Sequence, residues 1–476
     1  MTFTYGLAVV LIIFEGIIIQ CEGGSAFSSN KKTKIQSEDA EGANSSNGVQ
    51  DLPIELIEMI VSMSDFETIK NTVQSRVLRT FDPVMSRILE NYIIRISSDL
   101  NGRISEYQSN GDSFLQIKCY EKVKSFFEQF GDRVKKILIY YNENERRSKE
   151  INENIIKRYA NKFEELIIFN YVGDKFWEFI SNGKNDTIFP EVKKFQFTGY
   201  ISRKELKLNL IFPKLESVKL DTYLTNGNDL ANVKGLKELM LFTNSIPEYK
   251  FDDIFANNGN MTKICLYMPN RTETVDSIAK HLTKLKLLQL EFPRRNFMVR
   301  TNNNPVYKLP SVTHFDIGFY NIDEHIGIGN LSFDMPNLKK LTLNKYQIDN
   351  RFVDFIEQFK TLKIVEFTIM NVNAVKCIQK LKHIEEFTIT FLGSRFDSLE
   401  EMFKNFDKTS ELQRLKFVNI SEFRCKYYED DMNRINNHLK ETMKPTWRLS
   451  HGEQIGTDKK YLMFEREPCT CKSCNK

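Results

Sequence analysis

The chain has 476 residues, of which 41% are hydrophobic and 27% are charged, and its formal net charge is +4. So small a charge over this length lacks the basic bias of a nucleic-acid binder, and we expect no nucleic-acid partner. The length exceeds what one compact core usually needs, which favours several domains or a repeat array.

The first segment, residues 6–19, is almost wholly apolar and is interrupted only by Glu15, and small residues follow at Cys21, Gly23 and Gly24. Such a run is too short to span a bilayer of about 30 Å, and its length is typical of the apolar part of a signal peptide. We therefore predict a signal peptide at residues 1–23, secretion, and no membrane association after cleavage. The alternative is a buried or anchoring apolar segment.

Residues 24–50 are rich in Ser, Asn, Lys, Glu and Gly, which predicts a disordered linker. The pattern changes at Asp51, where a helical unit covering residues 51–95 is expected. Pro53 fits a first helical turn, because its missing N–H would have no partner there. Apolar side chains then recur at helical spacing. Connecting helices are expected over residues 96–130.

A repeat begins next and extends over residues 131–425. Its unit is a strand pattern of apolar-x-x-apolar-x-apolar, and successive units start 21 to 29 residues apart. This period is typical of leucine-rich repeats, whose units span about 20–29 residues. The twelve strand patterns start at Val134, Phe163, Val192, Leu215, Leu236, Met261, Leu285, Val312, Leu338, Leu362, Ile384 and Leu412.

The segments between several strands have helical spacing. One case contains Val275, Ile278, Ala279 and Leu282, a second contains Phe352, Phe355, Ile356 and Phe359, and a third runs over residues 396–406. A strand and a helix in each unit predict an α/β leucine-rich-repeat horseshoe of about twelve irregular repeats. Residues 426–476 are expected to form a C-terminal cap, with a helix over residues 432–439 and extended pieces at Trp447 and Tyr461, followed by a cysteine-containing tail.

No motif of an enzyme is found. Gly327-Ile328-Gly329 lacks the third glycine and the strand-to-helix context of a phosphate-binding loop. The histidines are scattered, and no serine or cysteine stands in a nucleophile motif. We therefore expect no catalytic residue, no metal and no cofactor. The tail from Cys469 to Cys474 could bind a soft metal or form a cross-link, or it could be a plain exposed tail.

The repeat pattern also predicts a binding surface. In each strand the side chains that alternate with the buried ones face the concave surface. Apolar and aromatic residues at these positions suggest a protein partner, and the candidates are Tyr140, Phe169, Met240, Phe242 and Tyr267. The alternative is that preceding helices cover these strands. The remaining positions carry Leu138 and Ile167 in the early strands, and Asp316, Thr342, Glu366, Thr388 and Lys416 in the later ones.

The unit that begins at residue 51 resembles an F-box. The matching residues are Leu52-Pro53-x-Glu55-Leu56-Ile57-x-x-Ile60, followed by spaced apolar residues at Ile69, Val73 and Val77. The resemblance implies docking on a Skp-type adaptor of an SCF ubiquitin ligase. It assigns that contact to Leu52, Pro53, Leu56, Ile57, Ile60 and Ile69. The alternative is an unrelated helical cap on the solenoid.

The whole arrangement of signal peptide, polar linker, F-box-like unit and irregular repeats resembles the secreted F-box/leucine-rich-repeat effectors of gall-forming plant-feeding insects. Membership implies export and then action in the cytoplasm or nucleus of a host cell. That would fit a repeat region whose cysteines, such as Cys265 and Cys377, stand singly and not in paired clusters. The concave face would select a host protein, and other subunits would transfer ubiquitin. A secreted binding protein without a ligase role, or one resident in the secretory pathway, remains the alternative.

Overall fold

The structure is a computed structural model in which the chain divides into two compact units, Met1–Leu52 and Pro53–Lys476. Every residue described here belongs to the second unit. The predicted signal peptide, the linker and nearly all of the F-box-like unit lie outside the described residues. Those residues are 89–90, 92–96, 114–117, 120–141, 146–170, 175–181, 189–199, 206–221, 228–242, 249–267, 273–292, 306–319, 332–344, 350–369, 381, 383–391, 412–418, 437, 447–453 and 460–466.

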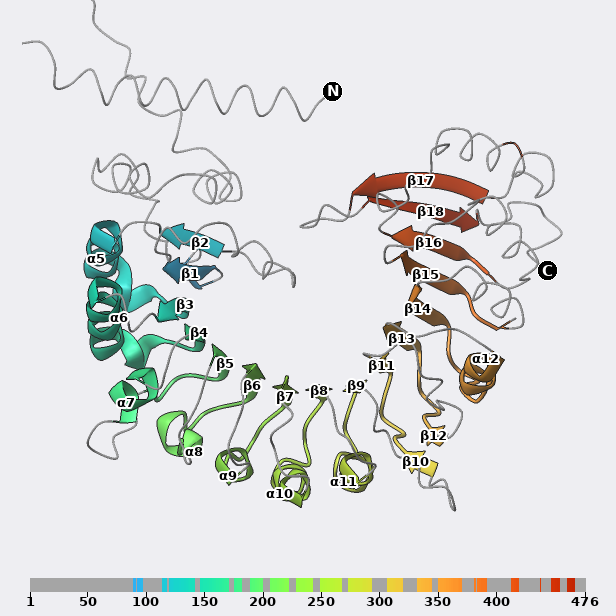
Figure 1. Cartoon of the computed structure of the whole chain (residues 1–476), viewed down its shortest axis with the longest axis horizontal. Helices are drawn as coiled ribbons and strands as arrows, with labels where there is room; N and C mark the ends of the chain where they lie inside the picture. Colours follow the sequence, from blue (N-terminus) through green and yellow to red (C-terminus); the bar gives the residue numbers. More distant parts are fainter. Residues whose placement is uncertain are drawn as a thin grey trace, which may run out of the picture. The chain divides into compact units, whose positions relative to one another are not determined.

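One long β-sheet dominates this unit, and its described part has sixteen strands (Figure 1). They are β1 (Ile93–Ile96), β2 (Phe114–Ile117), β3 (Lys136–Tyr141), β4 (Glu165–Asn170), β5 (Lys194–Gly199), β6 (Ser217–Asp221), β7 (Glu238–Leu241), β8 (Lys263–Tyr267), β9 (Leu287–Phe292), β11 (His314–Phe319), β13 (Lys340–Asn344), β14 (Ile364–Ile369), β15 (Glu386–Phe391), β16 (Arg414–Val418), β17 (Trp447–Glu453) and β18 (Lys460–Arg466). Neighbours from β2 to β16 pair in parallel, as expected when each strand returns through a crossover.

The crossover segments lie on one side of the sheet (Figure 1). Most contain a helix: α5 (Tyr120–Phe130), α6 (Arg146–Tyr159), α7 (Lys175–Ser181), α8 (Leu208–Ile211), α9 (Asn228–Ala231), α10 (Tyr249–Asn257), α11 (Glu273–His281) and α12 (Asn350–Glu357). Two consecutive crossovers contain short strands instead, β10 (Val306–Lys308) and β12 (Ser332–Asp334), which pair with each other. The predictions of helices at Val275–Leu282 and Phe352–Phe359 are confirmed by α11 and α12.

The twelve predicted repeat starts are all buried, with an exposed fraction of 0 to 1%. Apart from β10 and β12, each strand from β3 to β16 begins two residues after the predicted position. The offset has a local cause, because the first apolar residue of the pattern belongs to a turn. The amide of Leu338 donates to the carbonyl of Met335, and the same contact joins Val134 to Gly131 and Leu362 to Phe359. The turn directs the apolar side chain into the core, and the strand starts two residues later.

The core of the solenoid lies between the sheet and the crossover layer. The second and third apolar residues of each pattern point into it, as Leu341 and Leu343 do in β13, both fully buried. Aromatic rings fill the early repeats, where Trp177 of α7 packs 5.0 Å from Phe197 of β5 between ring centroids. These contacts establish a leucine-rich-repeat-like α/β solenoid. No helix in the described part of the chain is both long and apolar enough to cross a membrane.

The region before the first repeat differs from two predictions, a helical unit that continues to residue 95 and connecting helices over residues 96–130. Two of its segments, Ile93–Ile96 and Phe114–Ile117, are strands that extend the sheet, and α5 follows them. The side chains of Ile94 and Ile96 continue the buried rows of the repeats. The sheet therefore begins before the first strand pattern that the sequence makes recognisable.

The C-terminal cap contains the extended pieces predicted at Trp447 and Tyr461. They form β17 and β18, which pair antiparallel to each other, and β18 also pairs antiparallel to β16. The reversal of strand direction ends the parallel stack, and Phe464 of β18 is fully buried against it. The third predicted crossover helix, the Cys469–Cys474 tail and most of the helix predicted at 432–439 lie outside the described residues.

We expect the buried repeat positions to dominate stability. Replacing Leu338 with Ala should lower the free energy of unfolding by about 2–5 kcal/mol, because it removes a fully buried side chain and leaves a cavity. Leu210, which is 44% exposed, is the matched control, and its replacement with Ala should cost less than about 1 kcal/mol. Unfolding in urea measures both, and equal losses would contradict the assigned core.

Candidate protein-binding face

The side of the sheet away from the helices, called here the helix-free face, carries the predicted binding residues. Strand register aligns its side chains into two rows. The central row runs Arg95, Leu138, Ile167, Gln196, Lys219, Met240, Cys265, Gln289, Asp316, Thr342, Glu366, Thr388 and Lys416. Two positions further along the strands lies a second row that contains Tyr140, Phe169, Thr198, Asp221, Phe242, Tyr267, Glu291, Gly318 and Asn344.

At the β1 end of this face the side chains form a buried apolar cluster. Phe169 packs with Leu138, Ile167 and Ile93, and the Tyr140 ring stacks on it with centroids 5.2 Å apart. Phe169 is only 1% exposed, so it presents no surface to a partner, and its place among the binding candidates is corrected to a structural one. Side chains of neighbouring strands bury Phe169, and cover by preceding helices stays a prediction, whereas Tyr140 is half-buried.

A buried arginine, which sequence reasoning missed, stands beside that cluster. Arg95 is 4% exposed, and its guanidinium lies 5.8 Å from the centre of the Tyr140 ring. Its Nε and Nη2 atoms have no hydrogen-bond partner, and burial lowers the pKa of the guanidinium. Burying a cation is costly, and the interaction with Tyr140 offsets only part of the effect of burial on this pKa.

The middle strands bring the other candidates together. Met240, Phe242 and Tyr267 are all half-buried, and the rings of Phe242 and Tyr267 lie 6.4 Å apart between centroids. The Lys219 ammonium group lies 5.8 Å from the centre of the Phe242 ring, within the range of a cation–π contact. Large aromatic side chains that are only partly covered are typical anchors of protein interfaces. Their role in binding stays a prediction.

Two carboxylates follow on the next strands. Asp316 accepts a hydrogen bond of 2.8 Å from the Asn344 amide, and Glu291 accepts one of 3.0 Å from Gln289. Burial, together with the negative charge of Glu291, raises the pKa of Asp316 to about 7. The sequence placed Asp316 on this face but did not indicate Glu291, because the cross-strand register decides which carboxylates meet.

Cys265, in the central row, is 4% exposed, and burial raises the pKa of its thiol to about 12. A thiol that stays protonated at neutral pH is a poor nucleophile. Within the described ranges, no group of three His, Cys, Asp or Glu side chains is arranged to hold a metal ion.

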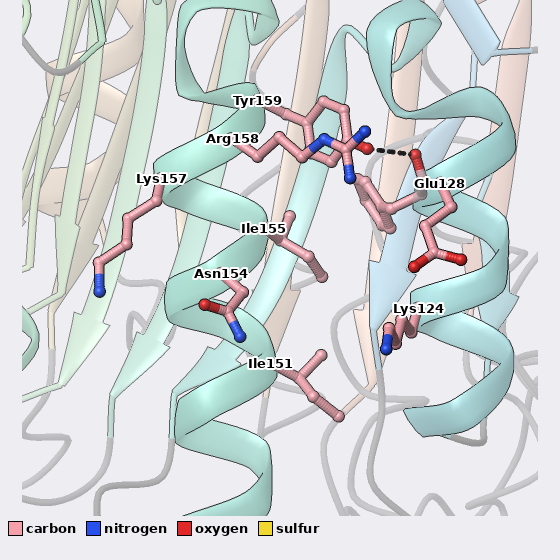
Figure 2. A pocket seen from close by; sticks show the side chains of 9 residues that line it. Lys124, Glu128, Ile151, Asn154, Ile155, Lys157, Arg158 and Tyr159 are labelled. Atoms are coloured by element: carbon pink, nitrogen blue, oxygen red, sulfur yellow. Dashed lines mark hydrogen bonds between the residues drawn. The ribbon is translucent and has the colours of Figure 1, made fainter.

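A groove between α5 and α6, on the opposite side of the sheet, was not predicted (Figure 2). It has a volume of about 500 Å³, with Phe127, Ile151 and Ile155 as apolar lining and Lys124 and Arg158 among its charged residues. The packing of Tyr159 against Phe127 and Gly131 forms one part of the groove wall. The Tyr159 hydroxyl donates to the Phe127 carbonyl at 2.6 Å, and its ring lies where a side chain at Gly131 would clash.

No protein-family model matches the chain, and no curated protein matches its sequence. Solved structures resemble it remotely. One is TLR13 in complex with ssRNA13, at 13% identity and a TM-score of 0.35, over 63% of this chain. Another is a protein from Bacteroides fragilis, at 13% identity and a TM-score of 0.23, over 62% of this chain and 74% of that one. This chain spans only 42% of the length of the TLR13 chain.

The raised pKa of Asp316 predicts a pH-dependent stability. Its folded pKa of about 7 exceeds the unfolded value of about 3.9, so the carboxylate destabilises the fold increasingly as the pH rises from about 4 to 7. Replacing Asp316 with Asn should therefore raise the free energy of unfolding at pH 8, by on the order of 1–3 kcal/mol, and change it little at pH 4.5.

The matched control for Asp316 is Glu386→Gln, on the same face. Glu386 forms an ion pair of 3.1 Å with Arg414, so its removal should destabilise the protein slightly at pH 8. Thermal or urea unfolding at both pH values measures the difference. A gain in stability from Asp316→Asn that is the same at both pH values would contradict the assigned titration.

Proposed function

We propose that the chain is a non-catalytic adaptor that selects a target protein with the helix-free face of its solenoid. The observation that carries the proposal is the half-buried aromatic pair of Phe242 and Tyr267, which lies on the helix-free face between a buried apolar cluster and a stretch of polar and charged residues. A parallel sheet usually has both of its faces covered. A row of side chains on a face without helices therefore favours contact with another macromolecule.

The second arm of the proposed adaptor is the F-box-like unit. Leu52, Pro53, Leu56, Ile57, Ile60 and Ile69 would bury against a Skp-type adaptor of a host SCF ubiquitin ligase. The support is the sequence pattern: apolar residues at helical spacing can insert into a partner groove as a group. Other subunits of the ligase would transfer ubiquitin to the captured protein, and this chain would need no catalytic residue, cofactor or metal.

Secretion and later action inside a host cell form the third part of the proposal. The apolar run at residues 6–19 supports export, and the resemblance to secreted insect effectors supports entry into the cytoplasm or nucleus of a plant cell. The single, buried Cys265 in the repeat array is compatible with a reducing compartment. The target would be a host protein.

The competing proposal is a secreted leucine-rich-repeat binding protein without a ligase role. The early strands favour it, because β1 and β2 extend the sheet toward the N-terminus. Residues before Ile93 could then serve as a helical cap on the solenoid and dock on no adaptor. Both proposals give the helix-free face the same task, and they differ only in the role of residues 51–92.

Capture of Skp adaptors decides between the two. The purified chain without residues 1–23 should retain plant Skp adaptors in a pull-down, and Leu52→Ala/Pro53→Ala should reduce capture by about tenfold or more, because it truncates a central apolar anchor. The matched control is Leu210→Ala, which removes an exposed leucine from the solenoid and should leave capture unchanged.

Two results would overturn the ligase role. Equal capture by the native chain and by Leu52→Ala/Pro53→Ala would show that the motif is not the contact. No capture by either, with the solenoid folded by circular dichroism, would favour the secreted binding protein.

A further inference from the structure

The charges of the helix-free face are mostly compensated across strands. Lys340 and Glu366 form an ion pair of 2.9 Å between β13 and β14, and Arg414 joins Glu386 and Glu465 at 3.1 and 2.9 Å. Such exposed pairs contribute little stability each, but every carboxylate in them lies beside a cation. A carboxylate on the same face that has no ion pair therefore differs from these.

Glu291 and Asp316 are the exception. They lie on adjacent strands, β9 and β11, and the charge of Glu291 acts on Asp316 strongly enough to raise its pKa. In the described part of the chain neither carboxylate forms an ion pair, and each accepts a hydrogen bond from a neutral amide, Gln289 or Asn344. Two neighbouring carboxylates that form no ion pair have a free-energy cost, which the distant charge of Lys340 offsets only in part and which an incoming cation would reduce further.

The aromatic pair adjoins these carboxylates. Tyr267 lies directly opposite Glu291 in the parallel register of β8 and β9, and Phe242 follows on β7. The Lys219 ammonium group already lies over the Phe242 ring, so a cation of the chain itself uses one end of the pair. A second cation placed between Tyr267 and Glu291 would contact a ring face and a carboxylate together, which strengthens both interactions.

We propose that Phe242, Tyr267, Glu291 and Asp316, called here the aromatic–acidic patch, bind an arginine side chain of a protein segment laid across the helix-free face. Arginine fits better than lysine, because its planar guanidinium stacks on an aromatic ring while its forked N–H groups reach two carboxylates. The inference rests on the proposed function, since it names the chemistry of the target that the adaptor selects.

Gly318 helps to position one of the carboxylates. It lies between Glu291 and Asn344 in the register, and a Cβ atom at this position would come within 3.1 Å of Glu291 Cγ. The Glu291 side chain therefore lies across the glycine. Gly318→Ala would displace the Glu291 carboxylate without altering any charge, which separates placement from simple electrostatic attraction.

The test uses the secreted chain from residue 24 onward and no Skp adaptor, so that its result does not depend on the ligase role. The probe is a fluorescein-labelled Gly-Arg-Gly-Arg-Gly peptide, compared with the lysine and glutamate versions by fluorescence polarisation. We expect arginine to bind more tightly than lysine and glutamate not to bind. General attraction would not explain this order, because the full chain carries a net charge of +4, and removal of residues 1–23, which contain Glu15 and Glu22 and no Lys or Arg, makes it more positive.

The variants separate the patch from the rest of the face. Glu291→Gln/Asp316→Asn should weaken arginine-peptide binding by about tenfold or more, and Tyr267→Ala or Gly318→Ala by about threefold to tenfold. Glu386→Gln is the matched control. It removes an equal charge from the same face, but one that Arg414 compensates, and should change affinity by less than about twofold.

The pH dependence gives an independent readout. Asp316 is faced by Glu291 on β9, Glu366 on β14, Lys340 on β13 and Cys265 on β8, and its pKa of about 7 is set by burial and Glu291. Lowering the pH from 8.5 to 6.5 protonates most Asp316 carboxyls, so the peptide should bind about threefold more weakly. Asp316→Asn should abolish that change.

Burial lowers the pKa of the His314 imidazole, two residues before Asp316 on β11, and the Asp316→Asn variant separates any effect of His314 from that of Asp316. Three outcomes would overturn the proposal: equal binding of the arginine and glutamate peptides, unchanged affinity in the folded Glu291→Gln/Asp316→Asn variant, or an equal loss in Glu386→Gln. Failure of Skp capture with intact arginine binding would remove the ligase role and leave the patch in place.

Discussion

Each repeat of this chain can bury its apolar side chains only if a neighbouring repeat is present. A single strand and its crossover expose most of their inner row, and stacking in parallel register converts those rows into one continuous core. Leu338 illustrates the dependence. Its turn places it under β13, and it is fully buried. The same constraint fixes which side chains reach the opposite face, because successive residues of a strand alternate between faces.

This constraint explains what the sequence could predict. The buried positions must repeat in every unit, so Val134, Leu285 and Leu412 could be placed in the core by pattern alone, and all three are fully buried. Helices α11 and α12 were recognisable because their apolar residues recur every three or four positions. The strands at Ile93–Ile96 and Phe114–Ile117 escaped detection, since four residues without the preceding turn do not display the pattern.

The helix-free face was predictable only in part. Counting from the repeat positions places Phe242 and Tyr267 on one face, and the structure brings their rings together. The burial of Phe169 could not be foreseen, because it depends on contacts outside its own strand. The meeting of Glu291 and Asp316 depends on cross-strand register, and the groove beside Tyr159 depends on how two helices pack around Gly131. A contact between two separate strands or helices gives no recognisable pattern in either segment of the sequence.

The separation of the two faces also explains how the fold tolerates an unfavourable charge pair. Asp316 and Glu291 repel each other without forming an ion pair in the described part of the chain, whereas Lys340 and Glu366 on the next two strands, β13 and β14, form one. Buried strain of this kind persists where the surrounding structure is stable enough to hold it, and it is commonly associated with function. In a solenoid the supporting free energy is spread over many similar interfaces. A local cost on the helix-free face therefore leaves the array intact, and a cationic partner would recover that cost as binding free energy.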